Sequence, residues 1–296
     1  MKVLITGNNS YIGNAFIEYV EDVYETHKCS LRESMWEYSS WSEYDSVLHV
    51  AGIAHSDVSH VTKEQQELYY VVNRDLTYKA AEKAKADGVK QFIYLSSAIV
   101  YGESAPIGKT KKISKDTEPT PSNFYGDSKL QGENRIISLQ TEDFRVVVIR
   151  TPMVYGKNAK GNFPKLLKLA KIVPVFPKIE NRKSLIYIKN LCEFIKLCIE
   201  KQYEGICLPQ NAEIVATSEL FRLIAEAEGR KVILVPGCTT SLKVFSRMTG
   251  YINKLFGNLE YKTQDSLHEC NYCKYTLEQS IAEICSENTI IINERE

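Results

Sequence analysis

The sequence predicts an α/β fold built on a doubly wound parallel sheet, and two observations support this. Short apolar segments typical of strands alternate along the first half of the chain with longer segments of helical apolar spacing. A turn with two glycines joins the first strand to the first helix, in residues 5–14, ITGNNSYIGN. Such alternation places helices on both faces of a parallel sheet, as in Rossmann-like folds.

Each element follows from its local pattern. The first strand is the apolar segment Lys2–Thr6, and helical apolar spacing follows over Ile12–Val23. The same reasoning predicts strands at Cys29–Leu31, Ser46–Val50, Gln91–Leu95 and Arg145–Ile149, and helices at Gln65–Ala86 and Tyr125–Leu139. Beyond Arg150 prolines interrupt the pattern, and the clearest helices are Leu191–Glu200 and Ser218–Glu228. We therefore expect a Rossmann domain over residues 1–152 with a return segment near 184–200, and a smaller, mixed α/β lobe from residues 153–183 and 201–296.

Composition narrows the classes of function. The 296 residues include 37 basic and 37 acidic side chains, so no global field favours nucleic acid. No apolar run reaches the roughly 18 residues that a membrane span requires, and the start of the chain does not resemble a secretion signal. The eight cysteines are scattered, which favours a reducing compartment. We expect a cytoplasmic protein.

One cluster of histidine and cysteine residues resembles a zinc-binding motif. His268, Cys270 and Cys273 form H-x-C-x-x-C, and Cys285 is the candidate fourth ligand of a zinc site. The chain has no second C-x-x-C pair. We predict no metal.

The turn after the first strand resembles a dinucleotide-binding pattern, T-G-x-x-G-x-x-G. Gly7 and Gly13 fill two of its glycine positions, where a Cβ would collide or a positive φ is needed. Ser10 replaces the middle glycine, and its hydroxyl is able to donate to phosphate. Tyr11 and Ile12 begin the helix whose N-terminus would meet the pyrophosphate. An ordinary strand-to-helix turn is the alternative interpretation.

Further motifs follow in order. Residues 44–55, YDSVLHVAGIAH, end a strand in the small pair Ala51-Gly52, next to Val50. Residues 94–102, YLSSAIVYG, end a strand in Ser96 and Ser97. Residues 125–129, YGDSK, place Tyr125 and Lys129 four apart on one helical face.

With these motifs, the chain resembles the extended short-chain dehydrogenase/reductase family of nucleotide-sugar epimerases and reductases. The likeness also includes Asn73 in YYVVNRDLT, RTPMVYG at 150–156 and RKSLIYIKNL at 182–191. It implies NAD or NADP as the cofactor. The residues that it implies for cofactor binding are Gly7, Ser10, Tyr11, Ile12, Gly13, Arg32, Val50, Ala51, Gly52, Asn73, Ser96, Tyr125, Lys129 and Pro152.

The resemblance also assigns catalytic roles. Tyr125 would exchange a proton with a sugar oxygen, and Ser97 would hold that oxygen. An unperturbed tyrosine titrates near pH ~10, and a neighbouring ammonium such as Lys129 favours the phenolate. The family's dehydratases have a Thr-Asp-Glu run where this chain has Ser97-Ala98-Ile99, so dehydration is disfavoured.

The same likeness indicates the substrate-binding residues. The family's usual asparagine in N-V-Y-G is Met153 here, while Asn162 in KGNF would line the substrate. Lys183, beside Arg182, stands where relatives use an arginine toward the diphosphate. A solvated pair on the lobe surface is the alternative.

The choice between NAD and NADP depends on the second strand. The family's acid for the adenosine ribose is replaced by Leu31, and Arg32 would suit the 2′-phosphate of NADP. Glu33 keeps NAD possible, and a surface Arg32 without a cofactor role is the alternative. The sequence favours NADP.

Two catalytic functions are considered, of which the resemblance favours the first, besides a non-catalytic binder that the Ser97, Tyr125 and Lys129 set disfavours. The first is C4 epimerisation of a sugar on a nucleotide or polyprenyl diphosphate, in surface polysaccharide synthesis. The second is NADPH-dependent reduction of a nucleotide-linked 4-keto-6-deoxy sugar. The resemblance also implies a homodimer.

One stretch suggests membrane contact. Residues 229–259 contain five basic residues and no acid, and apolar residues between Leu242 and Phe256 have helical spacing. A basic amphipathic helix over 242–256 would suit peripheral contact at the inner face of an anionic membrane. A helix packed within the substrate lobe is the alternative.

Overall fold

The computed structural model describes residues 1–53, 61–246, 250–266 and 271–293, and the chain divides into two compact units. Unit 1 comprises Met1–Glu103, Thr117–Pro152 and Leu191–Pro209. Unit 2 comprises Ser104–Asp116, Met153–Asn190 and Gln210–Glu296. Each unit is therefore assembled from three separate stretches of chain.

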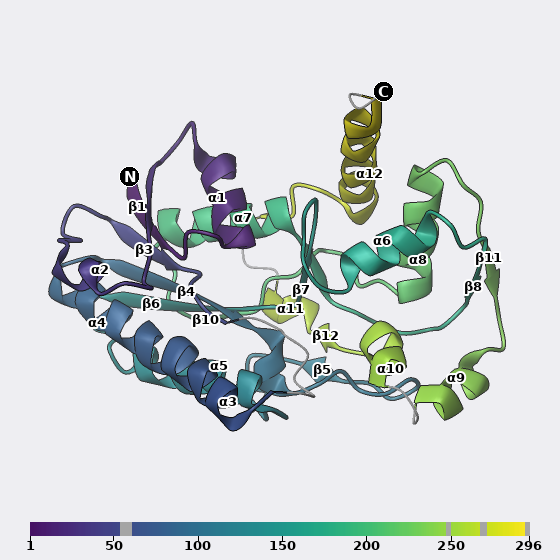
Figure 1. Ribbon diagram of the computed structural model, residues 1–296, viewed down its shortest axis with the longest axis horizontal. Coiled ribbons are helices and arrows are strands. Elements are labelled where there is room, and N and C mark those ends of the chain that lie inside the picture. The colour runs from purple at the N-terminus through teal and green to yellow at the C-terminus, as the bar shows by residue number, and fades with distance from the viewer. Residues whose placement is uncertain (54–60, 247–249, 267–270, 294–296) are drawn as a thin grey trace. The chain divides into compact units, whose positions relative to one another are not determined.

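Unit 1 contains a six-stranded parallel sheet in the order β2-β1-β3-β4-β6-β10 (Figure 1). Its strands are β1 (Lys2–Thr6), β2 (Glu25–Cys29), β3 (Ser46–His49), β4 (Gln91–Ser97), β6 (Arg145–Thr151) and β10 (Gly205–Cys207). β3 is buried along its whole length and β6 along nearly all of it, as expected for parallel strands covered on both faces. The strand order reverses between β1 and β3, the place where ligands bind in doubly wound sheets.

Helices cover both faces of this sheet, with α1 and α7 on one side and α3, α4 and α5 on the other (Figure 1). The helices associated with unit 1 are α1 (Tyr11–Val20), α2 (Met35–Tyr38), α3 (Lys63–Tyr70), α4 (Thr77–Ala86), α5 (Phe124–Ile137) and α7 (Ile188–Glu200). A π-helical segment, η2 (Val71–Leu76), joins α3 to α4, and a 3₁₀ helix, η3 (Ala98–Tyr101), follows β4. The predicted Rossmann-like α/β fold is confirmed.

Two expectations about strand positions need correction. The second strand ends at Cys29, because Leu31 is buried in the hydrophobic core with Leu4 and Trp36 instead of continuing the ladder. The segment that returns to the sheet is Leu191–Pro209, later than the expected 184–200, and its strand is β10, which pairs with β6.

Unit 2 is a mixed lobe with three small parallel sheets, pairing β7 with β9, β8 with β11 and β5 with β12. Its strands are β5 (Lys112–Ile113), β7 (Met153–Tyr155), β8 (Val175–Pro177), β9 (Leu185–Tyr187), β11 (Ile233–Val235) and β12 (Glu260–Tyr261). Its helices are α6 (Phe163–Ala170), α8 (Thr217–Ala227), α9 (Thr239–Ser246), α10 (Gly250–Phe256), α11 (Thr263–Ser266) and α12 (Leu277–Asn293). Across the described ranges, no helix has the length and apolar character needed to cross a bilayer.

The single helix expected over 242–256 is two helices, α9 and α10, and residues 247–249 between them lie outside the described residues. Phe256 is buried against Phe176, with ring centroids 5.6 Å apart, and Leu255 lines a pocket in unit 2. These two apolar side chains face the interior of the unit, which favours the packed alternative for α10.

Gly132 allows α5 to lie against η2. A Cβ at this position would stand 2.3 Å from the backbone oxygen of Asn73. Because a backbone atom cannot swing aside, we expect Gly132→Ala to lower the free energy of unfolding by about 1–3 kcal/mol. Urea titration would measure this, with Gly88→Ala as a contrast, since open space surrounds that glycine and only its positive φ opposes the change. An equally stable Gly132→Ala protein would contradict the packing described.

Candidate cofactor and catalytic site

The turn after β1 requires glycine at two positions. Gly7 has a φ of 97°, and a Cβ on it would lie 3.0 Å from the backbone of Ala51. A Cβ on Gly13 would lie 3.0 Å from the side chain of Val50 and 3.1 Å from that of Ile5, so this glycine allows α1 to approach the sheet. Val50, Ala51 and Gly52 follow β3, the strand next to β1, so these predicted residues lie beside the turn.

Ser10 caps α1. Its hydroxyl oxygen accepts a hydrogen bond from the N–H of Gly13 at 3.2 Å, which leaves the hydroxyl proton available for donation. Tyr11 and Ile12 begin the helix, where backbone N–H groups lack partners within the helix and suit an anion. Burial raises the pKa of the Tyr11 hydroxyl above its ordinary value, so this side chain is neutral.

β2 ends at Cys29, two residues before Leu31, where the sequence predicted the end of this strand. Leu31, predicted to stand where the family has the acid, is only 7% exposed and belongs to the core. Ser30 is the first residue after β2 and is exposed, as is Arg32, whose N–H donates to the Ser30 hydroxyl at 3.4 Å. No carboxylate therefore directly follows this strand.

Asn73 ties three segments of unit 1 together from η2. Its amide oxygen accepts from the N–H of Ile53 at 3.0 Å, and its amide nitrogen donates to the Ile53 carbonyl at 3.2 Å and to Ser128 on α5 at 3.1 Å. A Cβ on Gly52 would stand 3.0 Å from the Asn73 amide oxygen and 3.2 Å from the Lys129 ammonium. Asn73 thus holds the loop after β3 against the helix that carries Lys129.

Ser97, Tyr125 and Lys129 gather where β4 ends and α5 begins. Ser97 caps η3 by accepting from the N–H of Ile99 at 3.3 Å, and Tyr125 and Lys129 are 7% and 6% exposed, one turn apart on α5. The ring of Tyr125 packs edge-on against Tyr69, with centroids 5.9 Å apart. The Lys129 ammonium donates to the carbonyl of Leu95 at 3.1 Å and lies 4.6 Å from the centroid of the Tyr94 ring.

Burial sets the protonation of both groups in the cofactor-free site. It raises the pKa of Tyr125 to about 12, against the opposing effect of a hydrogen bond with the Ser97 side chain. It lowers the pKa of Lys129 to about 8, against the attraction of Glu133. Before any ligand binds, Tyr125 is therefore a neutral phenol at physiological pH.

The shifted pKa of Lys129 predicts a pH dependence of stability. The unfolded chain holds the ammonium up to its ordinary pKa of 10.5, so between about pH 8 and 10.5 it binds more protons than the folded protein. Lys129 therefore contributes a stability that increases as the pH rises through this window. We expect a smaller increase in Lys129→Met than in the wild type, measured by urea titration of cofactor-free protein. Parallel pH profiles would contradict the burial of this ammonium.

A buried ion pair links α5 to β6. Glu133 is fully buried and Arg150 is 3% exposed, and the guanidinium donates to the carboxylate at 2.7 and 3.0 Å. Arg150 also donates to the Tyr101 hydroxyl at 2.7 Å, and Ser96 donates to Glu133. Ser96, a predicted cofactor residue, is thus engaged in this network. Glu133 was missed by the sequence reasoning, although its spacing of four residues from Lys129 is a usable signal.

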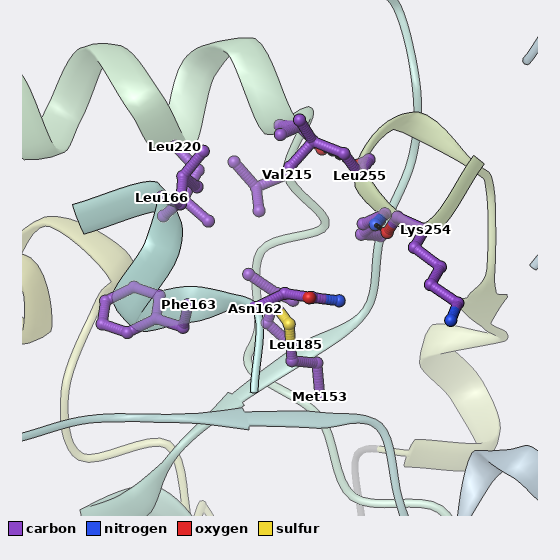
Figure 2. A pocket seen from close by; sticks show the side chains of 11 residues that line it. Met153, Asn162, Phe163, Leu166, Leu185, Val215, Leu220, Lys254 and Leu255 are labelled. Atoms are coloured by element: carbon purple, nitrogen blue, oxygen red, sulfur yellow. Dashed lines mark hydrogen bonds between the residues drawn. The ribbon is translucent and has the colours of Figure 1, made fainter. Parts of the chain in front are cut away.

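Unit 2 holds a pocket with largely apolar walls (Figure 2). Three of the predicted substrate residues, Met153, Asn162 and Lys183, line it. Lys183 donates to the backbone carbonyl of Lys254 at 2.7 Å, and burial lowers its pKa to about 8. Arg182 does not line the pocket, since its guanidinium pairs with Glu260. Pro152, a predicted cofactor residue, is the buried last residue of its stretch of unit 1.

The four candidate zinc ligands are only partly covered by the described residues. Within the described ranges, no group of three or more His, Cys, Asp or Glu side chains is arranged to hold a metal ion. His268 and Cys270 lie outside the described residues. Cys273 donates to the carbonyl of Gln210 at 3.4 Å, and Cys285 is buried.

The glycine turn at a strand reversal, the capped helix N-terminus and the buried Tyr-x-x-x-Lys pair fit a dinucleotide and define a class of cofactor-dependent α/β enzymes. The chain belongs to the NAD dependent epimerase/dehydratase family, whose model matches residues 3–207. This match confirms the resemblance seen in the motifs.

Two relatives and one solved structure illustrate the likeness. The chain is 32% identical over 223 residues to a UDP-glucose 4-epimerase of Vibrio cholerae, covering 72% of this chain and 67% of the relative. It is 31% identical over 169 residues to an N-acetyl-α-D-glucosaminyl-diphospho-ditrans,octacis-undecaprenol 4-epimerase of Escherichia coli O157:H7, covering 55% of this chain and 47% of the relative. Its fold is similar to that of a dTDP-4-dehydrorhamnose reductase from Clostridium acetobutylicum, with a TM-score of 0.73, 17% identity and coverage of 98% and 100%.

Proposed function

We propose that the protein is an NAD(P)-dependent sugar epimerase that acts by reversible hydride transfer at C4 of a sugar carried on a nucleotide or polyprenyl diphosphate. The observation that carries this proposal is the buried pair Tyr125 and Lys129, with the half-buried Ser97 at the end of β4, beside the glycine turn of the same unit. The two epimerase relatives support the reaction type. The homodimer implied by the motifs belongs to the same proposal, and sedimentation tests it.

The roles of the chain's own residues follow from their chemistry. Ser97 positions the sugar oxygen, and Tyr125 exchanges a proton with it. Proton removal requires the phenolate, which Lys129 favours by its charge, whereas proton return requires the neutral phenol. The cofactor, when bound, accepts and returns the hydride.

Dehydration is disfavoured by the residues after Ser97. Ala98 is 8% exposed and Ile99 follows it in η3, so neither supplies the acid that water elimination needs. The same site therefore suits reactions that stop at proton and hydride exchange.

The unit 2 pocket supports a diphosphate-linked carrier. Asn162 offers an amide and Lys183 an ammonium beside apolar walls, and with a pKa of about 8 Lys183 stays mostly protonated at neutral pH. We therefore assign the diphosphate to Lys183 and Asn162, and the carrier to the apolar wall.

A Lys183→Met variant tests this assignment. We expect KM for a diphosphate-linked sugar to rise about tenfold to a hundredfold with little change in kcat, because a charge-assisted hydrogen bond contributes about 1.5–3 kcal/mol to binding. Arg182→Met is the matched control, because Arg182 pairs with Glu260 and does not line the pocket. In this variant Glu260 still has Lys112 as an ion-pair partner, at 3.3 Å. Equal effects of the two changes would argue against a specific role of Lys183.

Reduction of a 4-keto sugar is the second candidate function. The neutral Tyr125 phenol is the form that donates a proton to a ketone, and the exposed Arg32 after β2, with no adjacent carboxylate, suits the 2′-phosphate of NADP. Both features fit an enzyme that consumes NADPH.

One experiment separates the two functions. Purified protein is incubated without oxygen with a panel of UDP-sugars and a 4-keto sugar, while reduced cofactor and product stereochemistry are followed. Interconversion of epimers without net loss of reduced cofactor supports the epimerase. Stoichiometric NADPH loss with the 4-keto sugar and no epimer exchange would replace it with the reductase.

A further inference from the structure

The small sheet formed by β8 and β11 has an apolar outer face. Val175 pairs with Ile233, and Pro177 with Val235, at the sites where both strands point outward. Val175 is 48% exposed, Ile233 67% and Val235 37%. The inner face is apolar as well, because Phe176 is buried and stacks on Phe221 at 3.9 Å. A strand pair with one solvated face normally alternates apolar and polar residues, so this outer face is unusual.

Two neighbouring residues extend this surface. Ile172 is 70% exposed and Leu169, on α6, is 39% exposed. Arg230 holds this turn beside β11 by donating to the carbonyls of Ala170 at 3.1 Å and Ile172 at 3.4 Å. We call this surface the β8–β11 face; it comprises Leu169, Ile172, Val175, Ile233 and Val235. It contains five of the eleven large exposed apolar side chains of the described residues, a concentration typical of an interaction site.

Exposed basic residues stand close in sequence to the residues of this face. Residues 157–178 contain six lysines and no acid. Lys168 precedes Leu169, and Lys178 lies next to Val235, to whose carbonyl its N–H donates at 2.8 Å. Lys231 stands two residues before Ile233, and the nearby acid Glu228 is paired with Lys171 at 3.0 Å. An apolar surface with a basic border complements an anionic lipid bilayer.

An apolar groove adjoins the face. It is lined by Asn162, Lys165, Leu166, Leu169, Lys254 and Leu255. Leu169 belongs to both the groove and the β8–β11 face, and four of the groove residues also line the pocket that contains Lys183. Apolar side chains are therefore continuous from the exposed surface to the pocket.

We propose that unit 2 docks on an anionic membrane through the β8–β11 face. β8 and β11, side by side at the right edge of Figure 1, present their outer side chains to the bilayer, and Lys168, Lys178 and Lys231 contact its headgroups. This docking goes beyond the proposed catalytic function. A polyprenyl-linked sugar would reach the Lys183 pocket through the groove, a consequence that does rest on the proposed function.

Vesicle flotation tests the docking. Full-length protein is mixed at low salt with phosphatidylcholine vesicles, with or without phosphatidylglycerol. We expect binding to the anionic vesicles that weakens with salt, and a loss of about tenfold or more in Ile172→Ser/Ile233→Ser, because two apolar side chains no longer enter the bilayer. Lys168→Glu/Lys231→Glu should weaken binding to the anionic vesicles only.

The control replaces two apolar residues of unit 1 that are even more exposed than Ile172 and Ile233. Met35→Ser/Tyr38→Ser changes side chains that are 75% and 86% exposed, and it should bind as the wild type does. Absence of vesicle binding at low salt would overturn the proposal. So would an equal loss of vesicle binding in Ile172→Ser/Ile233→Ser and in the control Met35→Ser/Tyr38→Ser. So would self-association that disappears in Ile172→Ser/Ile233→Ser, since a second copy would then cover the face. Turnover of a UDP-sugar should survive that change, so failure of docking is distinguishable from failure of the catalytic proposal.

Discussion

Tyr125→Phe is expected to lower kcat about a hundredfold to ten-thousandfold, because the phenol is the group assigned to exchange a proton with the sugar oxygen. Removing one buried hydroxyl leaves the edge-on packing against Tyr69 in place, so the fold should persist. The measurement combines steady-state kinetics with cofactor titration, which should show binding within a few-fold of the wild type.

Tyr38→Phe is the matched control for this variant. Tyr38 is 86% exposed in the same unit, so it loses a hydroxyl without any buried contact. Its kcat should equal that of the wild type. Full turnover in Tyr125→Phe would remove the acid–base assignment and with it both catalytic candidates.

Glu133→Ala is expected to lower the free energy of unfolding by about 3–5 kcal/mol. The change leaves the Arg150 guanidinium buried without its carboxylate and deprives Ser96 of its acceptor. Burying an unpaired charge costs more than the pair itself contributes. Chemical denaturation measures the loss, and Glu133→Leu/Arg150→Met should recover much of it because no charge remains buried.

Glu219→Ala is the surface counterpart. Glu219 pairs with Arg222 on α8, and both side chains are more than a third exposed, so its removal should cost less than about 1 kcal/mol. A similarly small loss in Glu133→Ala would show that the buried network does not support α5.

The motifs predicted the Rossmann-like fold of unit 1 because the strand, turn and helix patterns that define it are local. Gly7 is favoured by the positive φ of the turn itself, Gly13 approaches Ile5 within the same strand–turn–helix, and Tyr125 and Lys129 share a face through helical spacing alone. Each of these features depends on residues that are close together in the sequence, so a short motif is enough to predict it. Leu31 is different, because its burial depends on core residues from other elements that the pattern around β2 does not reveal.

The remaining features depend on contacts between distant residues. The π-helical turn that presents Asn73 interrupts an apparently continuous helical pattern over 65–86, and apolar spacing does not distinguish it from an α-helix. Arg182 and Lys183 are adjacent, yet Glu260 engages the first while the pocket receives the second. Short strands such as β8 and β11 carry too few residues for their alternation to stand out.

The discontinuous course of unit 1 affects how the protein matures. β10, the sheet's last strand, ends at residue 207 of 296, after the first two stretches of unit 2 have been made. A chain that contains only residues 1–152 would leave β6 as an open edge of the sheet. Open edges tend to pair with other chains. The sheet of unit 1 is therefore completed only after the first two stretches of unit 2 have been synthesised, and a fragment ending before β10 should need chaperone protection.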